Sequence, residues 1–301
     1  MLELTVPEQT APVAAKDFLR QSGLSLTLRR KIKHHGTMIC NGQPITWNDQ
    51  LTSGDCLQVT WPAQSALTPQ ALPLTVIYED ETLLIVDKPA GVMVHPTARK
   101  DEVTVANGVL HYYQSTNQPI AFHPVHRLDR QTSGLLLIAK NAHYHNCLLQ
   151  QGIKNLHRTY LAVVSGCVKE DQGTITSPIA RKPGSIIERM ISPAGQTAVT
   201  EYLVIARTAE ATLVQIRLLT GRTHQIRVHF SSLGHPLLGD DLYGGATDII
   251  ARQALHAAKL SFLHPIDNRI ITVTSPLPAD MKQLLTLFGL EGNKTVTQFY
   301  G

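Results

Sequence analysis

In the N-terminal part of the chain, apolar residues recur first at helical spacing and then in short alternating runs. The helical spacing covers residues 14–21 and 26–35 and predicts two short helices. The Asn41-Gly42 pair, which lies between two apolar runs, is typical of a two-residue hairpin turn. Residues 57–59 alternate as a further strand. The pattern therefore predicts a small α/β domain over residues 1–62.

A stretch without charged residues follows, and we interpret residues 63–73, rich in proline, alanine and polar residues, as a linker. Beyond it, residues 74–301 contain more strand-like runs than helical patterns. This order favours an α+β domain with a mixed, mostly antiparallel sheet flanked by helices over a regular alternation of strands and helices. The predicted strands are residues 74–78, 83–86, 135–139, 160–164, 202–206, 212–218 and 270–273, and the predicted helices are residues 142–150, 223–233 and 280–288.

The composition narrows the class of protein. With 301 residues, 43% of them hydrophobic and 17% charged, the chain is long enough for about two domains and is not typical of disordered, coiled-coil or collagen-like proteins. Its apolar runs are far shorter than the roughly 18 residues of a membrane span. Glu3 and Glu8 stand where a signal peptide carries positive charge, so we expect a cytoplasmic protein with no membrane contact. The four cysteines are scattered, which argues against a disulfide framework.

Positive charge is concentrated on the second predicted helix. The net charge of +4 is small, but Arg29, Arg30, Lys31 and Lys33 fall within one run that lacks acidic residues. Such a run forms either a solvated helix face or a set of phosphate contacts. The helix pair, the Ile-Cys-Asn-Gly that follows it and Asp55 resemble the αL-motif RNA-binding domain of ribosomal proteins and RNA-modifying enzymes. This resemblance implies that the four basic residues bind RNA.

The most concentrated candidate chemistry lies in residues 126–137, His-Arg-Leu-Asp-Arg-Gln-Thr-Ser-Gly-Leu-Leu-Leu. Asp129 stands between two arginines before a strand-like run, a position where catalytic groups are often displayed. A neighbouring arginine favours the ionised carboxylate, which a nucleophile or a base requires. The alternative is structural, with Asp129 capping a turn through the amides of Thr132 or Ser133.

Residues 126–137 form one of several motifs that follow one another along the chain. The others are Glu79-Asp80-Glu81, Asp87-Lys88-Pro89-Ala90-Gly91, His95-Pro96, residues 160–166, 221–229 and 234–240, Tyr243-Gly244, Leu255-His256-Ala257 and His264-Pro265. Through these motifs, residues 74–290 resemble the RluA family of pseudouridine synthases, which often carry an N-terminal RNA-binding domain. The resemblance implies isomerisation of uridine within RNA, in which the bond from the ribose to the ring nitrogen breaks and the ribose is rejoined to carbon five. It also implies RNA as the partner, with ribosomal RNA expected before transfer RNA.

By this resemblance, Asp129 takes the place of the catalytic aspartate, which acts either by addition to the sugar or by removal of a sugar proton to give a glycal. Tyr160 falls on a tyrosine that stacks on the base and removes the final proton. Arg227 falls on the arginine that pairs with the aspartate, and Ile226 on the aliphatic residue beside the base. Arg127 falls on an arginine that fills the space left by the flipped nucleotide. The alternatives are a core tyrosine, a surface helix arginine and, for Arg127, phosphate contact or solvation.

The histidines do not form a recognisable metal motif. His143 and His145 make an H-x-H, and His224 and His229 lie five residues apart, but the H-E-x-x-H spacing is absent. The glycine motifs that bind nucleotide phosphates are also absent. We therefore expect no metal and no cofactor, and uridine isomerisation involves neither redox chemistry nor phosphoryl transfer.

Three functions are compatible with the sequence: an RNA pseudouridine synthase, an RNA-binding protein on the same scaffold without catalysis, and a glycoside hydrolase with Asp129 as nucleophile. The presence of Asp129, Tyr160 and Arg227 together favours the first over the second. A glycoside hydrolase normally uses two carboxylates, and no second acid accompanies Asp129 in its motif. We expect the enzyme to act as a monomer. The glycine-rich residues 234–245, which include Asp240, are interpreted as a structural turn.

Overall fold

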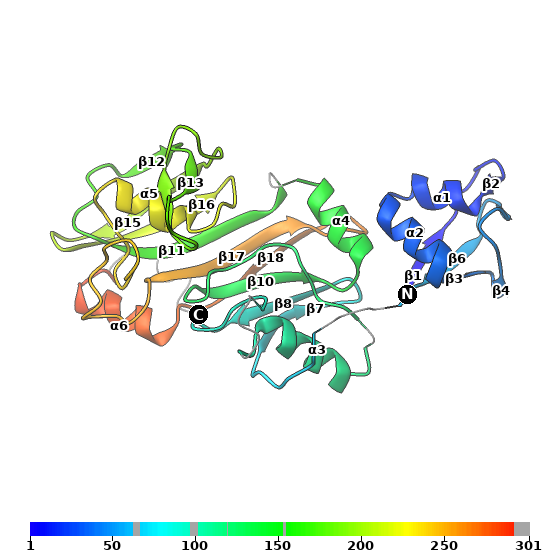
Figure 1. Ribbon diagram of the computed structural model, residues 1–301, viewed down its shortest axis with the longest axis horizontal. Helices are drawn as coiled ribbons and strands as arrows, with labels where there is room; N and C mark the ends of the chain where they lie inside the picture. The colour runs from blue at the N-terminus through cyan, green and yellow to red at the C-terminus, as the bar shows by residue number, and fades with distance from the viewer. Residues whose placement is uncertain (63–66, 97–101, 119, 153–154, 292–301) are drawn as a thin grey trace.

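The computed structural model describes residues 1–62, 67–96, 102–118, 120–152 and 155–291 (Figure 1). It shows a small N-terminal unit at one end of the molecule, drawn in blue, and a larger unit that is built on one long sheet. No helix within these described ranges is long and apolar enough to span a membrane.

The N-terminal unit packs two helices against a four-stranded sheet. Helices α1 (Ala15–Gln21) and α2 (Leu26–His35) confirm the two predicted helices, and Ile32 of α2 is buried in the core beneath them. Asn41 and Gly42 have φ values of +50° and +82°, as the predicted hairpin turn requires. In sheet order the strands are β1 (Leu2–Thr5), β6 (Cys56–Thr60), β3 (Thr37–Cys40) and β4 (Gln43–Pro44), and a separate pair is formed by β2 (Val13–Ala14) and β5 (Gln50–Leu51).

The larger unit is built on a ten-stranded sheet. Eight of its strands follow the order β12-β15-β16-β11-β17-β10-β8-β7, while β18 pairs with β17 and β9 pairs with β10. Only the pairing of β10 with β17 is parallel, which confirms the predicted mixed, mostly antiparallel sheet. In chain order the strands are β7 (Thr75–Glu79), β8 (Leu83–Lys88), β9 (His123–Pro124), β10 (Ser133–Ala139), β11 (His157–Ser165), β12 (Gln172–Ile175), β15 (Thr200–Arg207), β16 (Ala211–Leu218), β17 (Leu255–Leu263) and β18 (Ile270–Thr274).

Helices cover both faces of this sheet. Because side chains alternate along a strand, Leu136 and Ile138 of β10 pack on one face of the sheet, and Leu135 and Leu137 pack on the other. The apolar residues of α3 and α5 belong to the core on the first face, whereas those of α4 and α6 belong to cores on the second. The helices are α3 (Val105–Ser115), α4 (Ala142–Gln150), α5 (Gln225–Ser232) and α6 (Ala279–Leu287), and a separate hairpin is formed by β13 (Ile179–Arg181) and β14 (Arg189–Ile191).

The two longest elements that were absent from the predicted pattern are helix α3 and strand β17. Helix α3 contains Gly108, which lowers helix propensity but is required by packing, because a Cβ there would lie 2.7 Å from the Cβ of Leu72. Its start is fixed by a reciprocal capping box between Thr104 and Asn107. Strand β17 lies in the middle of the sheet. Its first four residues, 255–258, are all buried, so alternation is confined to its second half.

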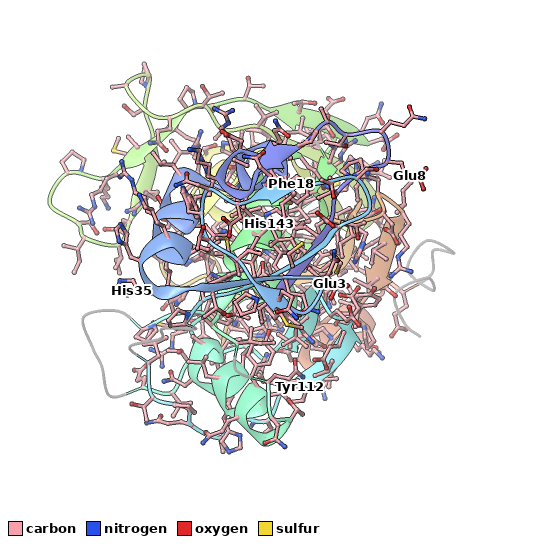
Figure 2. The ribbon with its side chains drawn as sticks, turned by 90° about the vertical axis from the view of Figure 1, so that its right-hand side faces the viewer. Glu3, Glu8, Phe18, His35, Tyr112 and His143 are labelled. Atoms are coloured by element: carbon pink, nitrogen blue, oxygen red, sulfur yellow. The ribbon has the colours of Figure 1, made fainter. Side chains whose placement is uncertain are left out.

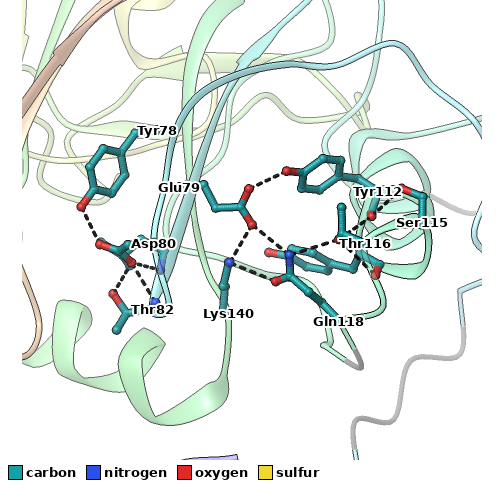
Figure 3. Close-up of polar contacts among 11 residues, drawn as sticks. Tyr78, Glu79, Asp80, Thr82, Tyr112, Ser115, Thr116, Gln118 and Lys140 are labelled. Atoms are coloured by element: carbon teal, nitrogen blue, oxygen red, sulfur yellow. Dashed lines mark hydrogen bonds and ion pairs between the residues drawn. The ribbon is translucent and has the colours of Figure 1, made fainter.

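A polar cluster ties the end of β7 to α3 and to the end of β10 (Figure 3). Glu79 accepts from Lys140 at 2.6 Å and from the hydroxyl of Tyr112 at 2.5 Å. Gln118 donates to Glu79 at 3.1 Å and accepts from Lys140 at 3.0 Å. The acidic segment that the sequence places between two strands therefore fixes the edge of the sheet.

The two units meet at α4. Tyr144 packs against the core of the N-terminal unit, and the Asn146 side chain donates to the carbonyl oxygen of Gly23 at 3.4 Å. A cavity of about 210 Å³ lies between the units, with Lys31 of α2 in its wall. Figure 2, which views the molecule from the N-terminal unit, shows His35 at the outer edge of α2.

We predict that Gly134→Ala lowers the free energy of unfolding by more than about 3 kcal/mol. Gly134 lies where β10 runs parallel to β17, its φ is +109°, and a Cβ there would lie 2.3 Å from the carbonyl oxygen of Ala257. Urea denaturation measures the loss. Gly184→Ala is the control: φ is +76° but nothing lies within 4 Å, so it is expected to cost only about 1–2 kcal/mol. Equal losses for the two variants would contradict the prediction.

Candidate active site

A cavity of about 390 Å³ opens between the loop that leads into β10, the start of β11, the N-terminal end of α5 and the last turn of α4. It therefore collects segments that are far apart in the sequence. All five of the residues predicted for a site in this part of the chain line it, namely Arg127, Asp129, Tyr160, Ile226 and Arg227.

Asp129 presents its carboxylate to this cavity. The loop around it closes through the main chain, because the amide of Thr132 donates to the carbonyl oxygen of Asp129 at 3.1 Å. The side chain is 24% exposed, and the Nη1 atom of Arg227 lies 3.7 Å from its Oδ2 atom. Within the described residues, the carboxylate receives no hydrogen bond from Thr132 or Ser133, so the turn-capping interpretation does not hold. The carboxylate is available to a ligand.

The loop that carries Asp129 is held by hydrogen bonds from two buried side chains, Lys88 and Arg252. Lys88 is fully buried, and its ammonium group donates to three main-chain carbonyl oxygens at 2.8, 2.8 and 3.0 Å, among them that of Arg130. Arg252 donates to the carbonyl oxygen of Gln131 at 3.1 Å. Burial lowers the pKa of Lys88 to about 7, and the charge of Asp129 opposes that effect. The position of Asp129 therefore depends on residues beneath the cavity floor.

Arg227 is held by a second aspartate. Its Nε and Nη2 atoms donate to the two carboxylate oxygens of Asp240 at 2.7 Å each, and Asp240 is completely buried. The guanidinium carbon also lies 4.9 Å from the centre of the Tyr243 ring. Only the remaining Nη1 atom points toward Asp129. Arg227 is thus a buried residue in an ion-pair network, not a surface helix arginine, and Asp240 does more than form a turn.

Tyr160 and Ile226 form an apolar part of the cavity wall. Tyr160 is 4% exposed and lies where the register of β11 against β17 shifts by one residue. Burial raises the pKa of its hydroxyl, Arg158 opposes this effect, and Asp129 adds to it. Ile226, also 4% exposed, contributes its side chain from the first turn of α5. Tyr160 therefore belongs to the sheet core and to the cavity at once.

The catalytic-domain sequence matches a known protein family. The family model described as RNA pseudouridylate synthase matches residues 82–232, a stretch that contains Asp129, Tyr160 and Arg227. The chain belongs to the RNA pseudouridylate synthase family. The family match does not include the N-terminal unit, whose resemblance to an αL-motif domain stays a prediction.

Individual relatives agree with this assignment. The chain is 41% identical over 279 residues to an uncharacterized RNA pseudouridine synthase, YjbO, of Bacillus subtilis, which covers 91% of this chain and 98% of the relative. It is 37% identical over 268 residues to ribosomal large subunit pseudouridine synthase D of Xanthomonas campestris, which covers 83% of this chain and 81% of that one. Human RNA pseudouridylate synthase domain containing 1 superposes with a TM-score of 0.57 at 26% identity, over 73% of this chain and 96% of that structure.

The four basic residues predicted on α2 lie in the N-terminal unit, outside the cavity of this pseudouridylate synthase. Arg30 and Lys33 are exposed, whereas Arg29 is half-buried and donates to the carbonyl oxygen of Leu24 at 3.1 Å. Lys31 faces the cavity between the two units. In the described ranges none of the four takes part in an ion pair, so their charges are not neutralised by neighbouring acids.

The histidines considered as metal ligands have other partners. Both ring nitrogens of His229 are engaged, with Thr200 and with the main chain of Ser177, at 2.9 Å each. His224, at the start of α5, lies 2.8 Å from the hydroxyl of Tyr243. No group of three or more His, Cys, Asp or Glu side chains that could hold a metal comes together in the part of the chain that the structure describes.

We predict that His126 makes folding sensitive to acid. His126 is buried, and its Nε2 atom accepts from the amide of Leu137 at 3.2 Å, so the ring is held neutral. Burial lowers its pKa to about 3, and the charge of Arg158 adds to the effect. Because the unfolded chain binds this proton near pH 6.5, stability is complete above that pH and falls by up to about 1.4 kcal/mol per unit as the pH drops toward 3.

His126→Gln keeps an acceptor for Leu137 but does not titrate, so its free energy of unfolding is expected to depend less steeply on pH between 6.5 and about 4. Urea denaturation at a series of pH values measures the slope. His35→Gln, at an exposed position on α2, is the control and is expected to keep the wild-type slope. A slope that is the same in His126→Gln and in the wild type would exclude the buried neutral ring as its cause.

Proposed function

We propose that this protein converts specific uridines of ribosomal RNA to pseudouridine, with the carboxylate of Asp129 acting on a uridine that has flipped into the cavity. The observation that carries the proposal is the way the Asp129 turn is closed: the main chain closes the loop, so the ionisable group faces the cavity with Arg227 beside it. A carboxylate in this setting is suited to act as a nucleophile or as a base.

The cavity accounts for the steps of such a reaction. A stacked uridine must leave its helix before a carboxylate can reach the sugar, which costs a few kcal/mol. Tyr160 offers a ring on which the base can stack, an interaction worth roughly 1–3 kcal/mol, and Ile226 offers an apolar wall. The N1–C1′ bond breaks, the uracil turns, C5 bonds to C1′, the C5 proton leaves and N1 gains a proton. Asp129 serves either as nucleophile at C1′ or as base toward the sugar. Tyr160 takes the C5 proton while its own hydroxyl proton passes to N1, so the phenol is neutral before and after the exchange.

Arg227 is proposed to orient Asp129. Asp240 uses both of its oxygens to hold one edge of the guanidinium group, which leaves Nη1 directed toward Asp129. The same ion pair argues against a glycoside hydrolase, because the second carboxylate near Asp129, that of Asp240, is buried and already bound to Arg227. A hydrolase of that kind needs both carboxyl groups free to reach the sugar.

We also propose that different parts of the chain have different functions. Residues 1–62 act as an RNA-binding domain of the αL type, residues 63–73 link it, and residues 74–301 carry the RluA-type catalytic domain. The unpaired basic residues of α2 support RNA binding by the first. The name of the relative from Xanthomonas campestris, a ribosomal large subunit pseudouridine synthase, supports ribosomal RNA over transfer RNA as substrate. We propose that the enzyme acts in the cytoplasm as a monomer, with Arg127 filling the space of the flipped nucleotide.

The substrate can be identified by mapping pseudouridines in total RNA from cells with and without the gene. Sites that vanish with the gene and return when purified protein acts on the unmodified RNA would name the uridine. Loss of a site in ribosomal RNA supports the proposal. Loss of a site only in transfer RNA would mean that transfer RNA, not ribosomal RNA, is the substrate. An unchanged map together with inactive purified protein would contradict the proposed function.

We predict that Asp129→Asn reduces isomerisation by more than about 10³-fold, because the amide is neither a nucleophile nor a base. RNA binding is expected to change little, since the carboxylate makes no contact that positions the loop. Single-turnover assays on the mapped RNA and a binding titration measure the two effects. Asp248→Asn, which alters an exposed carboxylate, is the matched control and should retain activity. Turnover near the wild-type rate in folded Asp129→Asn would refute the role of Asp129.

A second prediction tests the basic residues of α2. If Arg29, Arg30, Lys31 and Lys33 bind phosphates, replacing all four by glutamine should lower the slope of log affinity against log salt by roughly 0.7–0.9 for each phosphate that is no longer neutralised. The modified uridine should stay the same. Arg269→Gln, whose side chain is exposed and paired with Asp267 at 3.4 Å, is expected to leave the slope unaltered. An unchanged slope in the fourfold variant would mean that these residues form a solvated helix face and do not contact phosphates.

A further inference from the structure

Arg158 is a buried cation that has no acidic partner among the described residues. Three arginines are buried in the described part of the chain, and two of them, Arg227 and Arg252, each form a two-point bond with an aspartate at 2.6–2.9 Å. Arg158 is only 7% exposed, yet within the described ranges its guanidinium group makes a single hydrogen bond, from Nη2 to the carbonyl oxygen of Thr220 at 3.4 Å. Its Nε atom is buried without any partner among the described residues.

This arrangement is unfavourable unless a ligand completes it. A buried charge costs several kcal/mol when it is neither paired nor fully hydrogen-bonded. The fold supplies an aspartate partner for each of the other two buried arginines, Arg227 and Arg252. No carboxylate of the described residues pairs with Arg158, so an anionic group of a ligand can complete this arrangement.

The guanidinium group has access to the cavity. Arg158 lines the same cavity as Asp129 and Tyr160. It lies against the main chain of Gly221, where a Cβ would stand 3.0 Å from Nη1, so glycine leaves this side of the group open. Arg222, the next residue, is exposed and donates from Nε to the carbonyl oxygen of Thr197 at 2.9 Å, again without an acid. Positive charge therefore continues from the cavity wall to its mouth.

We propose that Arg158 binds a backbone phosphate of the target nucleotide when the uridine enters the cavity. The inference rests on the proposed function. Uracil and ribose are uncharged, whereas each phosphodiester carries one negative charge, so the phosphate is the only group of an RNA substrate that can neutralise Arg158. A guanidinium group matches phosphate oxygens with two parallel hydrogen bonds. Arg158 then positions the sugar that Asp129 must reach, because sugar and phosphate are covalently joined.

A different role would place Arg158 beside Tyr160 as an electrostatic partner, since its charge opposes the rise that burial causes in the pKa of Tyr160. The two roles differ in what they require of the RNA. A phosphate contact depends on the negative charge of one phosphodiester, whereas an effect on Tyr160 does not.

The test uses the RNA mapped above with a single phosphodiester replaced by an uncharged methylphosphonate, on either the 5′ or the 3′ side of the target uridine. In the wild type, one of the two replacements is expected to lower single-turnover kcat/KM by about ten- to a hundredfold, as for loss of a hydrogen bond to a charged group. Arg158→Gln should show that loss already with ordinary RNA and should lose little more with the methylphosphonate. Arg158→Lys, which keeps a charge, should recover part of the loss.

Arg217→Gln is the matched control. Arg217 also lies beside β11, on β16, but it is exposed and stands 3.6 Å from Glu201. It should behave like the wild type with both RNAs. The wild-type arm needs no variant, so tolerance of methylphosphonate on both sides would exclude the phosphate site even if Arg158→Gln does not fold.

Two results would overturn the phosphate site. One is a wild type that tolerates methylphosphonate on both sides of the target uridine. The other is an Arg158→Gln enzyme that loses rate but keeps the wild-type sensitivity to the phosphate charge, so that the two losses multiply, and this result would assign Arg158 to Tyr160. Wild-type turnover of unmodified RNA is measured first. Its absence would contradict the proposed function, whereas turnover with either of the two results would contradict only the role of Arg158.

Discussion

The two-point ion pair between Arg227 and Asp240 is the interaction around which the active-site wall is arranged. Both side chains are buried, and breaking such a pair leaves an uncompensated charge at a cost of about 3–5 kcal/mol. Asp240 is itself held by the amides of Leu242 and Tyr243 at 3.2 Å each. The pair therefore fixes α5, the 239–245 turn and the ring of Tyr243 as one body, and the orientation of Arg227 toward Asp129 follows from it.

A second ion pair, between Arg252 and Asp280, supports the loop that carries Asp129. Arg252 binds Asp280 at the start of α6 through two atoms and uses its remaining donors on main-chain carbonyl oxygens, including that of Gln131. A helix near the C-terminal end thus supports a loop more than a hundred residues earlier in the chain. Lys88 adds three bonds from β8. With its neighbours held in this way, the loop needs no bond from the Asp129 carboxylate, which is left for chemistry.

Local signals allowed part of this structure to be predicted. Helices α2 and α4 start and end at the predicted residues, because Ser25 and Asn141 cap them by accepting from main-chain amides at 3.2 and 2.9 Å. Strand β17 was missed because its first half, residues 255–258, is buried throughout, which leaves alternation only in its second half. Asp129 stood out by its charged neighbours. The resemblance implied that Arg227 lies beside Asp129, as it does at 3.7 Å. The pairs of Arg227 with Asp240 and of Arg252 with Asp280 could not be predicted, since each depends on how distant segments meet, which spacing along one sequence does not encode.

Burial also separates the two kinds of RNA contact that we propose for this protein. The charges on α2 are exposed or half-buried, so salt screens their attraction over a distance of about 8–10 Å, and they act on any phosphate that approaches. Arg158 is shielded from solvent and accepts a phosphate only in one geometry, after a nucleotide has entered the cavity. Exposed charge therefore favours encounter with RNA in general, whereas the buried charge favours the flipped nucleotide over the stacked one. Because a buried pair is less sensitive to salt, raising the ionic strength should weaken encounter more than it weakens retention of the flipped uridine.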